Sequence, residues 1–234
     1  IEVLRIFKNI KLDYIFHLGE YSRVEQSFDD INKVIEYNVR PLYEIVKLVE
    51  KNKAKLIYSG SSTKFSIYFP GDFESPYAWS KKNNIEFINL YSKWKKINYA
   101  IAYFYNVYGP NEIQTGKYAT IIGKCLYLKK TGKKSVPITL PGTQKRNFTH
   151  INDIVSGLLL VALYGNGDDY CIGSDESFSI IQVAKMLKMK ISYTKSKQGN
   201  RKGSKMNKTK LKKLGWVAKI KLHNYLLETM YNKN

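Results

Sequence analysis

Residues 55–59 read Lys-Leu-Ile-Tyr-Ser, a short apolar run that leads into the hydroxyl-rich segment 60–63. Apolar runs of this length, bounded by small polar residues, are typical of buried strands. A second such run lies upstream at 14–18, and a third lies downstream at 99–104. Residues with helical spacing separate the runs. The order strand, helix, strand, helix, strand predicts a parallel sheet covered by helices on both faces.

Two long helices are expected between these strands. The first carries apolar residues at helical spacing over 31–49, with Pro41 inside it. Because proline lacks an N–H and its ring clashes with the preceding turn, we expect a kink or two abutting helices there. The second begins at Ser75, an N-cap residue that Pro76 follows at the first helical position, and runs to about Lys96.

The charge of the chain leaves three explanations open. Its 234 residues carry 39 Lys and Arg against 19 Asp and Glu, a formal net charge of +20. The excess belongs either to a solvated surface, to a region that attracts an anionic small substrate, or to a nucleic-acid-binding surface, and a basic cluster over 195–213 suits any of them. Arginine is scarce, and we find no groove-reading helix or RNA-stacking motif. We therefore expect no nucleic-acid partner.

Membrane and secretory signals are absent from the sequence. The longest apolar run, 154–164, is too short to span a bilayer and predicts a buried helix. The residues from Ile1 onward do not form a secretory signal pattern. Cys125 and Cys171 both lie in apolar segments, which favours buried free thiols over a disulfide. We expect a cytoplasmic protein with no membrane partner.

Tyr77 and Lys81 are the strongest candidate catalytic pair. They are four residues apart on the second helix, so both side chains emerge on one face. A free tyrosine, with a pKa of about 10, is a poor base at neutral pH, but a nearby ammonium stabilises the phenolate and suits it to proton transfer. Ser61 lies at a strand end just before this helix and could share the same substrate oxygen. Taken alone, these residues are better explained by a surface pair and a serine-rich turn.

Further blocks in the same order along the chain decide between these explanations. The blocks are Asp13–Gly19 followed by Ser22 and Val24, Asn38-Val39, Tyr105–Pro110, Arg146–Ile154, Cys171–Ser174, Ser177–Ala184 and Leu214–Trp216. Together with the Tyr-Lys helix, they resemble the extended short-chain dehydrogenase/reductases, and within them the NAD-dependent epimerase/dehydratase family.

The resemblance implies an α/β fold: a Rossmann-like parallel sheet with helices on both faces and a smaller C-terminal α/β substrate lobe. Residues 1–110 would form a partial NAD-binding domain, and residues 111–234 mainly a nucleotide-sugar-binding lobe with segments interleaved with the sheet. The family's first strand-helix-strand unit, with its Gly-x-x-Gly-x-x-Gly turn, has no match in these residues. We expect either a piece of a longer protein or a natural truncation.

The same resemblance implies roles for individual residues. Tyr77 would be the acid/base, Lys81 would tune it and bind the nicotinamide ribose, and Ser61 would be the hydroxyl partner. The residues implied to bind NAD are Leu18, Gly19, Ser22, Asn38, Ser59, Tyr77, Lys81 and Phe104. The residues implied to bind the nucleotide-sugar are Ser61, Thr63, Asn106, Arg146 and Arg201. No metal is implied, and His17, His150 and Asp153 are interpreted as structural hydrogen-bonding groups.

The residues after Ser61 favour one reaction. Dehydratases and decarboxylases of this family usually carry an acidic residue just after the catalytic hydroxyl, whereas Ser62, Thr63 and Lys64 follow here. The resemblance then implies epimerisation through a keto intermediate, at C4 of a UDP-sugar. The alternatives are a nucleotide-sugar 4,6-dehydratase or reductase, or a truncated remnant that binds a nucleotide-sugar without catalysis. The family commonly forms dimers through the helices that would include Tyr77.

Three positions depart from the family's pattern. Glu20 stands where a small residue is usual, and we expect its carboxylate either to point away from the cofactor diphosphate or to pair with Arg23. Pro41 replaces a glycine, and the dipeptide Lys64-Phe65 replaces Val-Tyr.

Overall fold

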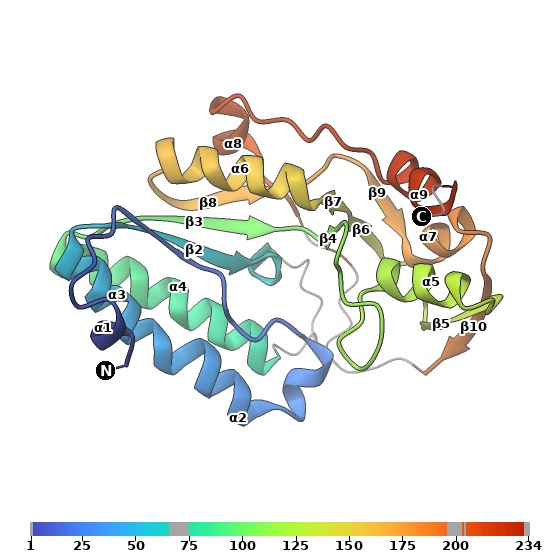
Figure 1. Cartoon of the computed structure of the whole chain (residues 1–234), viewed down its shortest axis with the longest axis horizontal. Helices are drawn as coiled ribbons and strands as arrows, with labels where there is room; N and C mark the ends of the chain where they lie inside the picture. Colours follow the sequence, from blue (N-terminus) through green and yellow to red (C-terminus); the bar gives the residue numbers. More distant parts are fainter. Residues whose placement is uncertain (1, 66–74, 196–202, 204, 232–234) are drawn as a thin grey trace.

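The structure is a computed structural model and describes residues 2–65, 75–195, 203 and 205–231. Its centre is a four-stranded parallel sheet in the order β1-β2-β3-β8 (Figure 1). The strands are β1 (Tyr14–His17), β2 (Lys55–Ser61), β3 (Asn98–Phe104) and β8 (Gly167–Ile172). The register pairs His17 with Tyr58, and Ser61 with Phe104, so the carboxyl ends of the strands meet at one edge. The parallel sheet and the three strands expected from the sequence are confirmed.

Two long helices, α3 (Arg40–Asn52) and α4 (Pro76–Lys95), cover one face of the sheet (Figure 1). The short helix α1 (Glu2–Ile6) packs against α3. Near Pro41, where a kink or two abutting helices were expected, α2 (Ile31–Val34) runs directly into α3 through a π-helical turn, Ile35–Val39. In this turn the Arg40 N–H donates to the Ile35 carbonyl, one residue further back than in an α-helix.

The opposite face is covered by α6 (Ile151–Tyr164) and α8 (Thr209–Lys213). The prediction that 154–164 is a buried helix is only half right. Ile154 and Leu158 pack in the core, whereas Val155, Leu159 and Leu163 are 46%, 52% and 56% exposed. The reason is that α6 lies on the sheet with one face only, so an all-round apolar sequence leaves its other face uncovered.

The remaining elements build a second hydrophobic core beside the sheet. They are α5 (Ile121–Lys130), the parallel pair β5 (Ser135–Thr139) and β10 (Lys190–Thr194), α7 (Ile180–Met186) and α9 (Leu222–Tyr231). Two small pairs link them to the sheet: β4 (Val107–Tyr108) with β7 (Thr149–His150), and β6 (Lys145–Asn147) with β9 (Ser177–Ser179). The boundary at 110/111 stays a prediction. Strand β8 and helix α6 belong to residues 111–234, yet β8 is part of the four-stranded sheet and α6 packs on it.

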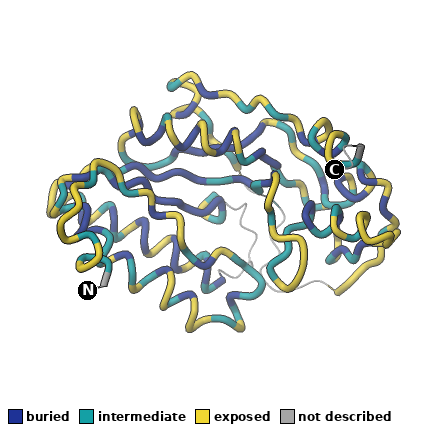
Figure 2. Tube along the Cα trace, viewed as in Figure 1, coloured by how far each residue is buried: buried dark blue, intermediate teal, exposed yellow. Residues whose placement is uncertain are grey.

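Buried residues run along the strands and the inner faces of the helices (Figure 2). Cys125 and Cys171 are buried free thiols, as expected. Within the described ranges, no helix combines the length and apolar character that a membrane crossing requires.

Candidate active site at the carboxyl ends of the strands

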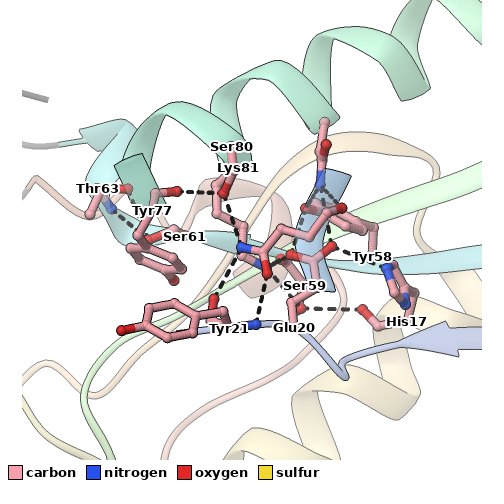
Figure 3. A network of polar contacts seen from close by, with 12 residues as sticks. His17, Glu20, Tyr21, Tyr58, Ser59, Ser61, Thr63, Tyr77, Ser80 and Lys81 are labelled. Carbon is pink, nitrogen blue, oxygen red and sulfur yellow. Dashed lines mark hydrogen bonds and ion pairs between the residues drawn. The ribbon is translucent and has the colours of Figure 1, made fainter. Parts of the chain in front are cut away.

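Helix α4 positions the Tyr-Lys pair. The Ser75 hydroxyl caps the helix by accepting the Ala78 N–H at 3.1 Å, and Pro76 follows at the first turn. Tyr77 and Lys81 then fall on the face that packs toward the sheet, where they are 8% and 4% exposed. The predicted spacing therefore brings both side chains to the carboxyl end of β2 (Figure 3).

Lys81 forms a buried ion pair with Glu20. The distance from Lys81 Nζ to Glu20 Oε2 is 2.6 Å, and the two side chains are 5% and 1% exposed (Figure 3). The ammonium also donates to the Ser59 carbonyl oxygen at 2.6 Å and to the Ser59 hydroxyl at 3.4 Å. Of the two alternatives for Glu20, pairing with Arg23 is wrong. Arg23 instead donates to the Tyr118 carbonyl, from Nη2 at 2.7 Å and from Nε at 3.2 Å.

Further groups surround the Glu20 carboxylate. Tyr58 donates its hydroxyl to Oε2 at 3.1 Å, Asn84 donates to Oε1 at 3.3 Å, and His17 Nε2 lies 3.1 Å from Oε1. Burial alone would raise the pKa of the Glu20 carboxyl, but the His17 contact and the charge of Lys81 hold it below the usual 4.5. The pKa of Tyr58 is raised by burial and by the negative charge of Glu20. His17 thus lies beside the carboxylate, but its Nε2 is buried without a hydrogen-bond partner in the described part of the chain, so the hydrogen bond expected of this residue is not formed.

Ser61 closes β2 and is 6% exposed. Its hydroxyl oxygen accepts the Thr63 hydroxyl at 2.9 Å and the Thr63 N–H at 3.2 Å, so the two substrate-binding candidates are adjacent (Figure 3). Gly60, one residue earlier, packs so tightly that a Cβ added there would lie 2.5 Å from the Tyr103 ring.

Tyr77 packs in a small cluster with Tyr21 and Val34. Within the described ranges, Tyr77, Ser61 and Lys81 do not hydrogen-bond one another through their side chains. The structure therefore gathers the three predicted catalytic residues at one edge without linking them directly. The separation is consistent with unliganded active sites, whose catalytic hydrogen bonds often tighten only when substrate binds.

Asn38 ties the loop after β1 to helix α4. Its Oδ1 accepts the Tyr21 N–H at 2.7 Å, and its Nδ2 donates to the Tyr21 carbonyl at 3.1 Å and to the Ser80 hydroxyl at 2.9 Å. The Asn84 amide donates to the Asn38 carbonyl at 2.8 Å. Sequence reasoning missed Ser80 and Asn84, although both lie at helical spacing from Tyr77 and share its buried face.

The other residues expected to bind the cofactor lie along the same edge. Leu18 is 45% exposed, and a Cβ added to Gly19 would meet no atom within 4 Å, so there is open space over the end of β1. Ser22 is exposed and accepts a hydrogen bond from Arg23 at 3.3 Å. Phe104 is half-buried at the end of β3.

The remaining substrate-binding candidates, Asn106, Arg146 and Arg201, divide into three cases. Asn106 donates to the Asn147 carbonyl at 3.1 Å, next to Arg146 on β6, so these two predicted blocks meet. Arg146 is half-buried and donates to the Lys145 carbonyl at 3.0 Å. Arg201 lies outside the described residues.

A cavity of about 600 Å³ lies where the loop after β1 meets α5 and β5. Its lining is Arg23–Gln26, Asp29, Gly116, Lys117, Ala119, Ile121, Lys124, Pro137–Thr139, Gln144 and Ile180. Tyr77 and Arg146 do not line it. Gln144 Oε1 is buried without a hydrogen-bond partner in the described part of the chain, so an acceptor faces this region unpaired. Sequence reasoning missed Lys117 and Lys124, because single lysines carry no signal in so basic a chain.

His150 and Asp153 make the structural hydrogen bonds that were predicted. His150 Nδ1 accepts the Asn152 N–H and caps α6, and Asp153 Oδ2 accepts the N–H groups of Lys219 and Ile220 at 3.0 Å and 2.9 Å. In the residues that the structure covers, no group of three His, Cys, Asp or Glu side chains could hold a metal ion.

Two curated proteins are similar to the chain in sequence. The chain is 30% identical to a dTDP-D-glucose 4,6-dehydratase of Dictyostelium discoideum over 78% of its length, and it spans 46% of that relative. It is 26% identical to a putative UDP-glucose 4-epimerase of Methanocaldococcus jannaschii, covering 92% of this chain and 74% of that one. The chain thus spans only about half the length of some curated relatives that it matches.

A solved structure shares the fold. The UDP-glucose 4-epimerase of Thermotoga maritima with UDP-glucose superposes with a TM-score of 0.89 at 22% identity, over 98% of this chain and 80% of that chain. The model of the NAD dependent epimerase/dehydratase family matches residues 2–173. The chain therefore belongs to the NAD-dependent epimerase/dehydratase family.

Proposed function

We propose that this chain carries the proton-transfer and substrate-binding residues of an NAD-dependent nucleotide-sugar epimerase. The observation that supports this best is the convergence of Ser61, Tyr77 and Lys81 at the carboxyl ends of the strands, where ligands of open parallel sheets bind. In this role Tyr77 takes the proton of a sugar hydroxyl, with Ser61 hydrogen-bonded to the same oxygen. Tyr77 returns the proton after the keto-sugar has rotated in the site to present its opposite face.

One feature of this edge favours the binding of NAD, and another competes with it. The open space over Gly19 and the exposed Leu18 leave room for the nicotinamide end, and Ser59 and Lys81 would hold its ribose. When bound, this cofactor would accept a hydride from the sugar carbon and give it back. Glu20 is the residue that competes, because its carboxylate holds the ammonium of Lys81.

The cavity supports a nucleotide-sugar as substrate. Three basic side chains, Arg23, Lys117 and Lys124, line it together with the acidic Glu25 and Asp29, and Lys117 is paired with Asp30 at 3.0 Å. The excess of basic groups favours a diphosphate. Asn106 and Arg146 would hold the same substrate from the adjoining strands, and a guanidinium suits phosphate oxygens. A UDP-sugar is the proposed substrate, by analogy with the T. maritima and M. jannaschii proteins.

Dehydration of a dTDP-sugar is the second candidate, because curated dehydratases match the chain as well as the epimerase does. The residues after Ser61 favour epimerisation. Lys64 lies in that stretch, which has no carboxylate beside the Ser61 hydroxyl. The Lys64 ammonium pairs with Asp168 and Asp169 at 2.5 Å and 2.8 Å.

Product analysis tests the proposal. The chain is incubated with NAD and, in turn, UDP-glucose, UDP-N-acetylglucosamine and dTDP-glucose, and the sugars are identified by NMR spectroscopy. A C4 epimer of either UDP-sugar is expected. A 4-keto-6-deoxy sugar from dTDP-glucose would establish the dehydratase, and no turnover with any of the three would favour the non-catalytic remnant.

A homodimer through α3 and α4 completes the proposal. These helices expose Tyr43, Trp79, Leu90 and Trp94, of which Trp94 is 61% exposed, and the last three share one face of α4. Light scattering after size exclusion should give twice the chain mass, and W94E should give a single chain mass. A monomeric wild-type chain at micromolar concentration would contradict this contact.

The buried free thiols of Cys125 and Cys171 suit the reducing cytosol in which we propose that the protein acts.

A further inference from the structure

Glu20 lies in an arrangement that neither the proton transfer nor the substrate cavity explains. Its side chain is 1% exposed and is surrounded by polar groups from three different elements (Figure 3). Tyr58 comes from β2, Lys81 and Asn84 from α4, and His17 from the end of β1. These contacts hold the carboxylate in place, although Glu20 lies on a loop and follows Gly19, which has open space around it.

Each N–H group of the Lys81 ammonium already has a partner within the protein. An ammonium has three N–H donors. The Glu20 carboxylate at 2.6 Å, the Ser59 carbonyl at 2.6 Å and the Ser59 hydroxyl at 3.4 Å account for the same number. The ring of Tyr58 lies 4.9 Å from the ammonium and covers a further side. The charge that should face a ribose and a phenolate is therefore already compensated within the protein.

We propose that Glu20 is a positioning residue that acts through Lys81, withholding the ammonium from the nicotinamide ribose and from Tyr77 until the cofactor displaces it. This inference rests on the proposed function, since it takes NAD as the ligand of Lys81. A ligand that binds only the fraction of molecules with a free ammonium binds more weakly by that fraction. Glu20 thus lowers the affinity for NAD.

The exchange leaves the Glu20 carboxylate hydrogen-bonded. Because the pKa of Glu20 lies below 4.5, the competitor is an anion at neutral pH. When Lys81 turns to the ribose, the carboxylate keeps the hydrogen bonds from Tyr58 and Asn84. These bonds offset part of the cost of a buried charge that has lost its ion-pair partner, so the pair can open when a ligand competes for the ammonium.

Calorimetric titration of two variants tests the inference. E20Q removes the charge and nearly keeps the shape, and E20A removes the group. Both should bind NAD about tenfold tighter than the wild-type chain or better. Binding of ADP, which lacks the nicotinamide ribose, should not change. E50Q is the matched control, because Glu50 accepts Tyr91 at 2.5 Å and lies 3.6 Å from Lys95, at the far end of α4.

A second measurement uses the unmodified chain, in case the variants do not fold. With ¹⁵N-labelled lysine, the buried Lys81 ammonium should give an NMR signal that shifts when NAD saturates the protein and stays in place with ADP. The inference is overturned if that signal does not move, or if the Glu20 variants bind NAD no tighter than the wild type. Where the wild type nevertheless binds NAD, the proposed function survives; where no protein binds NAD, both fail.

Discussion

The ion pair of Glu20 and Lys81 stabilises the chain only through the hydrogen bonds around it. Two buried charges lose their hydration, and their attraction repays that loss when the remaining donors and acceptors are also satisfied. Ser59 does this for Lys81, and Tyr58 and Asn84 do it for Glu20. Removing one partner therefore costs more than the attraction alone, because it leaves the other charge buried and uncompensated.

The first prediction concerns stability against pH. The pKa of Glu20 lies below its unfolded value of 4.5, so its contribution is present above 4.5 and is lost as the pH falls through the folded value. E20Q should lower the free energy of unfolding by about 3 kcal/mol or more at neutral pH, by leaving Lys81 unpaired. The gap should narrow as the pH falls from 4.5 toward the folded pKa. A series of urea unfolding curves from neutral to acidic pH measures it, and a gap that widened as the pH fell would contradict the assignment.

The second prediction concerns Tyr77. Y77F removes the proposed acid/base without changing the packing of the ring with Tyr21 and Val34. It should lower kcat about 100-fold or more, with an unchanged unfolding transition. Y91F is the matched control, because Tyr91 is buried on the same helix and donates to Glu50 instead. Equal rates for wild type and Y77F would exclude Tyr77 as the acid/base.

At the scale of the elements, the start of α4 determines the positions of Tyr77 and Lys81. The Ser75 hydroxyl is 1% exposed and holds the first turn through Ala78. S75A should destabilise the chain by about 1 kcal/mol, and S75T should keep most of the cap. Thermal unfolding of both variants measures the difference. A cap effect would be refuted if S75T were as unstable as S75A.

The close contact of β2 with Tyr103 supports a further prediction. G60A would put a Cβ 2.5 Å from the Tyr103 ring, and neither the strand nor the ring can move freely in the core. We expect a loss of about 1 to 3 kcal/mol, measured by urea unfolding. G19A is the control, since nothing lies within 4 Å there, and equal stability of the two variants would show that Tyr103 relaxes.

At the scale of the whole molecule, the cavity joins the loop after β1 to the second core. K124A should weaken the binding of UDP about tenfold or more, because the proposed contact of this cavity-lining ammonium with the diphosphate would be lost. K130A is the matched control, being an exposed lysine on the same helix that does not line the cavity. Calorimetry measures both, and equal affinities would remove the cavity from the substrate site.

The sequence by itself determined the sheet, its long helices and the Tyr-Lys face of α4. These follow from local periodicity and from caps such as Ser75-Pro76, which act over a few residues. It also marked Glu20 as out of place, but could not name its partner. Only the tertiary structure decided that Glu20 meets Lys81, that Asn38 bridges to Ser80, and that Lys124 lines a cavity with Arg23. Each of these contacts joins segments far apart in the chain, and packing, which no local pattern encodes, brings them together.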